Sequence, residues 1–175
     1  IIELAEKYAK KGKFQDAINE YRKLISGSAQ DINFRNIIAD LYLKMEYKAK
    51  AIEELTIIAS FYDEKDQHLQ SMAIYKKINK LAPENLDATK KLADLYFNQG
   101  FLSEAKAEYL KVARELKKNN QTREAIAVYE KILKLDKRDV QAKLTLAELY
   151  TKERLIDQAI ELFNEVAELK IRSNA

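Results

Sequence analysis

The sequence predicts an all-α protein, an α-α superhelix or solenoid of about ten antiparallel helices. Composition supports this, because the 175 residues include one Pro and three Gly, and the dominant Ala, Leu, Ile, Lys and Glu enter helices at little cost. A repeat supports it further. The stretch Leu92–Tyr96 recurs in similar form as Ile38–Tyr42 and Leu146–Tyr150, each 54 residues from the next, and such a period is typical of repeat proteins.

The repeat extends well beyond those five residues. Residues 68–121 and 122–175 are identical at 15 of 54 aligned positions, where chance gives about three. We expect a single solenoid over residues 1–175, made of units 14–67, 68–121 and 122–175 with a partial helix over 1–13 before them. Because residues 1–11 align with the second half of a longer helix in the other units, we expect the chain to be a segment of a longer protein.

Apolar residues at three- and four-residue spacing predict the individual helices. Ser28, Ala82 and Asp136 occupy equivalent positions before helices, and Pro83 suits a first helical turn. The predicted ranges are 2–11, 14–26, 31–45, 48–64, 68–80, 84–98, 102–118, 122–135, 138–152 and 156–171.

Small residues recur in pairs that are 12 positions apart. Twelve residues cover half of one helix, a short turn and half of the next, so we expect the two members to meet where antiparallel helices cross. Small side chains there let the backbones approach closely. The pairs are Ala5/Ala17, Ala39/Ala51, Ala59/Ser71, Ala93/Ala105, Ala113/Ala125 and Ala147/Ala159.

These pairs, with a Tyr three residues after the first member and an aromatic residue four after the second, resemble the tetratricopeptide repeat (TPR). Ala93, Tyr96, Ala105 and Tyr109 show the pattern in full. The resemblance covers essentially the whole chain. It implies a solenoid with a concave groove that binds proteins.

The chain departs from this family at its turns and in its spacing. Gly12 and Gly100 fit the family's turn glycine, but equivalent positions hold Glu46, Asp66, Asn120 and Arg154. The family repeats every 34 residues, whereas the second-helix small residues here step alternately by 34 and 20. A 20-residue step leaves room for one new helix, so we expect helices 48–64 and 102–118 to pack on both neighbours and to be buried on most sides.

The resemblance also implies which residues line the groove. Asp40, Asp94 and Glu148 follow the small residue of the first helix, and the positions around them add Lys side chains and one exposed aromatic, Phe97. Such carboxylates would recognise basic or amide groups of an extended or helical peptide. The alternative is that Asp40–Lys44 and Glu148–Lys152 are ordinary helix-surface pairs. The predicted partner-binding residues are Asn36, Asp40, Leu43, Lys44, Lys90, Asp94, Phe97, Asn98, Leu144, Glu148, Thr151 and Lys152.

We therefore predict a protein-protein interaction scaffold for an unidentified protein or peptide partner. The alternative is a self-assembly module that stacks end to end with other copies. RNA binding would need a basic concave face, but we expect Lys76, Lys77 and the basic residues of 131–138 to lie on a solvated outer face. The acidic groove also disfavours capture of a peptide's terminal carboxylate, which some family members achieve with Lys, Asn and Arg.

The sequence gives no indication of an enzyme. His68 is the one His, and it falls near a helix start without the positioned partner and pocket that a general base needs. We expect no catalytic, cofactor or metal site. The 31 basic and 28 acidic side chains are interleaved, and no run approaches the roughly 18 apolar residues of a membrane span. The absence of Cys and of a signal peptide in this segment favours a cytoplasmic location.

Overall fold

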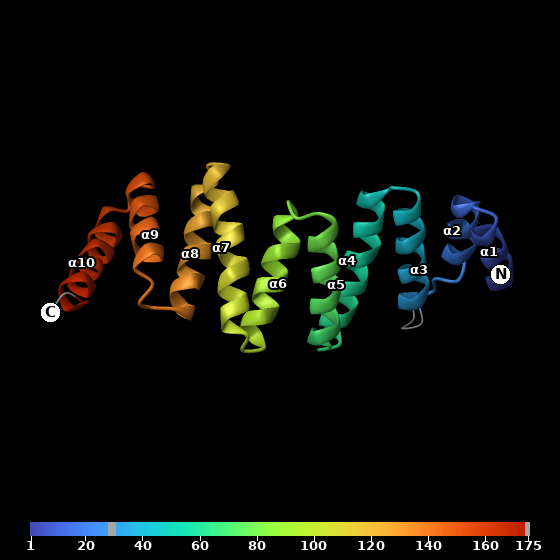
Figure 1. The fold of residues 1–175 in the computed structure, drawn as a ribbon, viewed down its shortest axis with the longest axis horizontal. Helices are drawn as coiled ribbons and strands as arrows, with labels where there is room; N and C mark the ends of the chain where they lie inside the picture. The colour runs from blue at the N-terminus through green and yellow to red at the C-terminus, as the bar shows by residue number, and fades with distance from the viewer. Residues whose placement is uncertain (28–30, 174–175) are drawn as a thin grey trace. The chain divides into compact units, whose positions relative to one another are not determined.

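A computed structural model describes residues 1–27 and 31–173, and these residues form ten α-helices without strands (Figure 1). This confirms the predicted all-α class. Ser28, the expected helix start, lies outside the described residues. The helices are α1 (Ile2–Lys10), α2 (Phe14–Arg22), α3 (Asp31–Lys44), α4 (Lys48–Glu64), α5 (His68–Leu81), α6 (Leu86–Asn98), α7 (Leu102–Lys118), α8 (Thr122–Leu135), α9 (Val140–Lys152) and α10 (Ile156–Ser173).

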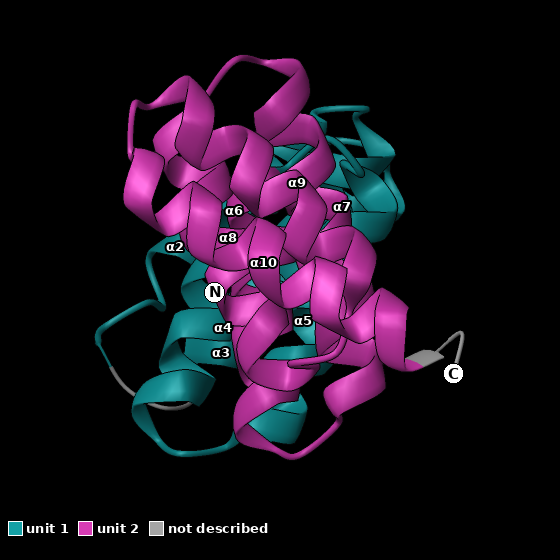
Figure 2. Cartoon of the chain, turned by 90° about the vertical axis from the view of Figure 1, so that its left-hand side faces the viewer, with its two compact units in different colours: residues 1–85 teal, residues 86–175 magenta. Residues whose placement is uncertain are grey.

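The chain forms two compact units, Ile1–Asn85 and Leu86–Ala175 (Figure 2). Unit 1 contains α1 to α5 and unit 2 contains α6 to α10. Within each unit, every helix packs against its neighbours in sequence, which is the expected arrangement of a helical repeat. Part of the core of unit 1 gathers Ile18, Tyr21, Ile38 and Leu41 around the small residues of α1, α2 and α4.

The paired small residues are buried between helices that pack on each other, as a location at helix crossings requires. All twelve are buried, with at most 2% of their surface exposed. One pair is joined directly, because the Ser71 hydroxyl donates a hydrogen bond of 3.1 Å to the Ala59 carbonyl oxygen. A larger side chain at these positions would push the two backbones apart.

The helix boundaries agree with the predicted ranges to within four residues, with two corrections. Helix α2 ends at Arg22 rather than at residue 26. Helix α1, against which α2 packs, has 9 residues, fewer than the 17 residues of α4, against which α5 packs. Pro83 lies outside α6, in a turn where the Asn85 N–H donates to the Ala82 carbonyl at 3.0 Å; its fixed φ suits the second position of such a turn.

The backbone conformation at the turns confirms that the Gly and non-Gly turn residues occupy equivalent positions. Gly12 and Gly100 have φ of 73° and 79°, in the left-handed region that glycine adopts without penalty. The four replacing residues adopt the same conformation, which costs an L-residue about 1 kcal/mol or more. They are Glu46 (62°), Asp66 (55°), Asn120 (58°) and Arg154 (62°).

Helices α4 and α7 each pack on both neighbours, α4 against α3 and α5, and α7 against α6 and α8. The expectation that α4 is buried on most sides is wrong in part, because Ala49 and Ile57 are exposed. Two packed faces leave a third side of the helix open to solvent. Among the described residues, no helix has the length and apolar character to cross a membrane.

Candidate functional site

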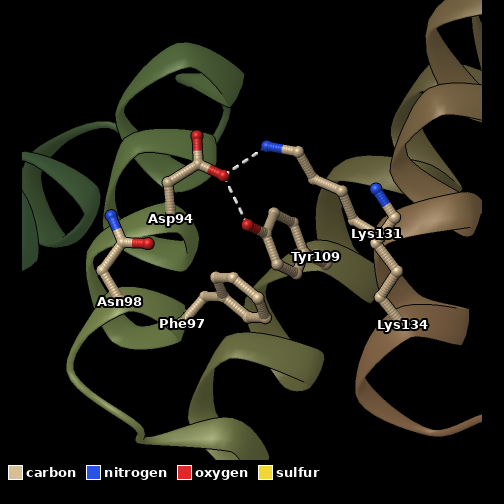
Figure 3. Close-up of a pocket in the computed structure, with 6 residues that line it drawn as sticks. All are labelled: Asp94, Phe97, Asn98, Tyr109, Lys131 and Lys134. Carbon is tan, nitrogen blue, oxygen red and sulfur yellow. Dashed lines mark hydrogen bonds and ion pairs between the residues drawn. The ribbon is translucent and has the colours of Figure 1, made fainter.

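Unit 2 contains an open pocket of about 340 Å³ between α6, α7 and α8 (Figure 3). We call it the α6–α8 pocket. The lining side chains of α6 are three or four positions from the first of them, Asp94, so they project from one face of the helix. Lys131 and Lys134 of α8 share a face for the same reason. The lining residues are Asp94, Phe97 and Asn98 from α6, Tyr109 from α7, and Lys131 and Lys134 from α8.

Asp94 is the centre of the pocket's polar network. Its carboxylate accepts hydrogen bonds from the Tyr109 hydroxyl and from the Lys131 ammonium group, the latter at 2.5 Å (Figure 3). Tyr109 is 1% exposed, and burial, its bond to Asp94 and the nearby negative charge all raise the pKa of Tyr109. The hydroxyl therefore stays protonated and holds the carboxylate in place.

The exposed part of the pocket combines an apolar surface with positive charge. The Phe97 side chain is 42% exposed, as the sequence analysis predicted. Lys134 is exposed and has no ion pair among the described residues. The arrangement provides an aromatic contact surface beside an ammonium group that is available to a ligand.

A second hollow of about 430 Å³ adjoins this pocket and shares Asp94 and Lys131 with it. Its other lining residues are Asp87, Lys90 and Lys91 of α6. Together the two hollows contain two carboxylates and four ammonium groups, a net charge of +2.

The predicted distribution of basic residues is therefore wrong at Lys131 and Lys134. They were expected on a solvated outer face, but they line the pocket beside Asp94. Lys77 likewise meets Asp40, at 2.9 Å. Lys77 of α5 and Lys131 of α8 therefore reach the carboxylates of α3 and α6, because in each unit the Lys and the Asp project from the same side of the helix layer.

The predicted residues on α3 lie in unit 1 and line none of the hollows described above. Asp40 pairs with Lys77 of α5 rather than with Lys44. Leu43 is half-buried against the core of unit 1, and the Lys44 ammonium lies 5.9 Å from the centre of the Phe14 ring. Asn36 is half-buried.

The predicted residues on α9 do not line the α6–α8 pocket either. Glu148 pairs at 3.5 Å with Lys117 of α7 rather than with Lys152. Lys152 instead donates to the Asn120 side chain at 3.1 Å, and the Thr151 hydroxyl bonds to its own helix. Leu144 is half-buried. Of the predicted set, four residues on α6 are brought together by the two hollows: Lys90, Asp94, Phe97 and Asn98.

A further charged cluster fixes the turn between α8 and α9. Lys106 of α7 pairs with Asp136 at 2.8 Å and with Asp139 at 2.7 Å. The Lys106 hydrogen bond and the Arg138 N–H lower the pKa of Asp136. Burial acts to raise the pKa of Asp139, but hydrogen bonds from Lys106 and from the Ala142 N–H outweigh it and lower that pKa. Asp139 is also the N-cap of α9.

His68 begins α5, as expected for a residue near a helix start. Its ring nitrogens lie 3.9 Å from carboxylate oxygens of Asp63 and Asp66, which exceeds hydrogen-bonding distance. In the part of the chain that the structure describes, no group of His, Asp and Glu side chains has the arrangement of a metal site.

A tetratricopeptide-repeat family model matches residues 116–170, which extend from the end of α7 into α10. A crystal structure of MamA shares 20% sequence identity, with 99% of this chain and 98% of that chain covered at a TM-score of 0.31. The C-terminal part of a TPR repeat-containing protein from Cytophaga hutchinsonii shares 14% identity, with 99% and 80% covered at a TM-score of 0.35. No curated protein sequence matches the chain.

Proposed function

We propose that the chain is a protein-interaction scaffold and that the α6–α8 pocket binds a peptide segment of its partner. The observation that carries this proposal is the exposed Phe97 ring beside Lys134, in an open pocket of about 340 Å³ formed by three helices. Aromatic side chains are enriched at the surfaces through which proteins recognise one another. The TPR match at residues 116–170 supports a role in binding proteins.

The charge of the two hollows favours an acidic partner. Lys131 is neutralised by Asp94, but Lys134 is not, and the hollows together have a net charge of +2. This charge is opposite to the one expected from the predicted carboxylates Asp40, Asp94 and Glu148, which favoured a partner with basic or amide groups. The preferred peptide would place a carboxylate near Lys134 and an apolar side chain on Phe97.

We further propose that the scaffold is built on the 54-residue unit, with the boundaries 14–67, 68–121 and 122–175. The left-handed turn residues 12, 46, 66, 100, 120 and 154 support this, because they step by 34, 20, 34, 20 and 34. The two-sided packing of α4 and α7 also fits a shared helix in each unit.

Selection of random peptides on the purified chain tests the binding proposal. We expect the selected peptides to combine Asp or Glu with an apolar residue, and Phe97→Ala and Lys134→Glu each to weaken binding about tenfold or more. Lys118→Glu is the matched control, because it makes the same charge change at an exposed site on α7 outside both hollows. If both pocket variants bind the peptides as well as wild type does, the pocket is not the site.

A further inference from the structure

A further opening in unit 2 adjoins the α6–α8 pocket across helix α8. It has a volume of about 320 Å³ and lies between α8, α9 and α10; we call it the α8–α10 hollow. Lys134 lines this hollow as well as the α6–α8 pocket, so the two openings meet at its side chain. A peptide seated on Phe97 can therefore continue past Lys134 into the α8–α10 hollow.

The floor of the α8–α10 hollow is hydrophobic. It is formed by Leu146 of α9, which is buried, and by Leu133 of α8 and Leu162 of α10, which are half-buried. Glu165 lies at the edge of this floor and is paired with Lys143, so its charge is already neutralised. The floor can accept an apolar part of a peptide, and the charges that remain available lie elsewhere in the hollow.

Tyr150 of α9 lies close to the other two carboxylates of the hollow, Glu130 and Glu161. The Tyr150 hydroxyl donates a hydrogen bond of 2.8 Å to Glu130. Burial, this hydrogen bond and the negative charges of Glu130 and Glu161 raise the pKa of Tyr150 to about 12. In the part of unit 2 that the structure describes, neither carboxylate belongs to an ion pair. The lysines of the hollow, Lys134 and Lys137, lie one turn or more beyond Glu130 along the chain.

Unit 1 shows which side chain fits beside this tyrosine. Tyr42 of α3 lies two 54-residue units before Tyr150, and its hydroxyl accepts a hydrogen bond of 3.1 Å from the Arg22 guanidinium of α2. The same guanidinium nitrogen pairs with Glu54 of α4 at 3.2 Å. Because α2, α3 and α4 are the equivalents of α8, α9 and α10, an arginine of the chain itself fills in unit 1 the place that corresponds to the α8–α10 hollow.

Unit 2 lacks this arginine and has carboxylates around its tyrosine instead. The equivalent of Arg22 is Glu130, and the equivalent of Glu54 is Leu162. Glu161, next to Leu162, supplies the second negative charge near the tyrosine. A guanidinium from a partner would restore the hydrogen bond to the tyrosine hydroxyl and would form charge-assisted hydrogen bonds with the carboxylates.

We propose that the peptide bound at the α6–α8 pocket crosses α8 and places an arginine side chain beside Glu130, Tyr150 and Glu161. This inference rests on the peptide binding proposed above and adds a second contact to it. A helix is about 10 Å in diameter and an extended chain advances about 3.3 Å per residue, so about three or more residues separate the arginine from the residue on Phe97. The partner segment is acidic and apolar at one end and basic at the other.

The peptides selected from a random library on the purified chain give the first test. We expect them to contain an arginine at a constant distance from the acidic and apolar residues that the α6–α8 pocket selects. Replacing this arginine by alanine in the peptide should weaken binding to the wild-type chain about tenfold or more. Selected peptides that lack a basic residue, but still lose affinity for Phe97→Ala, would overturn the second contact and leave the binding proposed for the α6–α8 pocket intact.

Glu130→Arg tests the position of the arginine, because it gives unit 2 the side chain that unit 1 has at Arg22. We expect this variant and Glu161→Gln each to weaken binding of the arginine peptide about tenfold and to affect the alanine peptide far less. Glu124→Arg is the matched control, because it makes the same charge change at an exposed site on α8 outside the hollow; it should bind both peptides as wild type does. If Glu130→Arg and Glu161→Gln change the binding of both peptides equally, or of neither, the arginine does not lie in the α8–α10 hollow.

Discussion

Equivalent Asp–Lys ion pairs occur in the two units, but the Asp side chain is more exposed to solvent in unit 1 than in unit 2. In unit 1, Asp40 and Lys77 keep 59% and 39% of their side chains exposed. In unit 2, Asp94 and Lys131 keep 34% and 40%. The residue beneath the pair explains the difference, because Leu55 in unit 1 is replaced in unit 2 by Tyr109, whose hydroxyl bonds to Asp94.

This comparison shows how one substitution in a repeated framework creates a candidate site. Leu55 and Tyr109 are both fully packed, with 0% and 1% exposed, so both serve the core. Only Tyr109 adds a polar group that orders the carboxylate above it. Phe97 then supplies the exposed apolar surface in unit 2, where the equivalent Leu43 of unit 1 is half-buried.

The largest expected effect tests what the two units share. Ala93→Leu and Ala39→Leu should each lower the free energy of unfolding by about 1–3 kcal/mol, because both overfill a helix crossing. Urea denaturation measures the loss. Ala107→Leu, at an exposed position of α7, is the control and should change stability little; an equally small loss for Ala93→Leu would place Ala93 outside a crossing.

A second effect should be confined to unit 2. Lys106, Asp136 and Asp139 have Ile52, Ala82 and Asn85 as their equivalents in unit 1, so unit 1 lacks this cluster. Asp139→Ala should cost about 1–2 kcal/mol at neutral pH through loss of the N-cap and of the Lys106 pair.

The pH dependence of that cost follows from the lowered pKa values of Asp136 and Asp139. A lowered pKa in the folded state gives stability that is complete above the unfolded value of 3.8 and is lost as the pH falls through the lower folded value. Wild type and Asp139→Ala should therefore converge in acid. Denaturation curves at neutral and acidic pH measure this, and a gap that stays constant would contradict the assignment.

A third prediction addresses the difference in the ion pairs themselves. Asp94→Asn should cost about 1–2 kcal/mol, because it weakens bonds from both Tyr109 and Lys131. Asp40→Asn should cost about 0.5 kcal/mol or less, as is usual for an exposed pair. Thermal unfolding of the two variants compares them directly, and equal costs would mean that Tyr109 does not strengthen the site in unit 2.

The smallest effect is a gain in stability and should be alike in both units. Glu46→Gly and Arg154→Gly each relieve a left-handed backbone conformation, and we expect about 0.5–1 kcal/mol of stabilisation after the greater entropy of the unfolded glycine is subtracted. Glu53→Gly, in the interior of α4, is the control and should destabilise instead. A loss of stability in the two turn variants would show that their side chains make contacts worth more than the strain.

The sequence was sufficient to predict the helices and the buried small residues between them, because both depend on local, repeated patterns. The apolar spacing located the helices, and the 12-residue pairs identified Ala93 and its partners as buried residues between packed helices. Pro83 was misplaced because a proline suits both a first helical turn and the second position of a β-turn.

The pocket was predicted only on its α6 side. Lys131 and Lys134 were missed because an interleaved basic residue on a helix usually faces solvent, and the side of the layer to which α8 presents them depends on tertiary packing. One signal was present in the sequence: Lys77 and Lys131 each follow an Asp by 37 positions. That regular spacing between opposite charges on different helices indicates a repeated contact.

The most direct test of binding at unit 2 is a backbone amide NMR titration of the chain with a peptide selected on it. We expect the largest shift changes at Asp94, Phe97 and Lys131, with little change at their unit 1 equivalents Asp40, Leu43 and Lys77. Changes of equal size at both sets, or changes confined to unit 1, would contradict the proposal that Tyr109 and the exposed Phe97 make unit 2 the binding site.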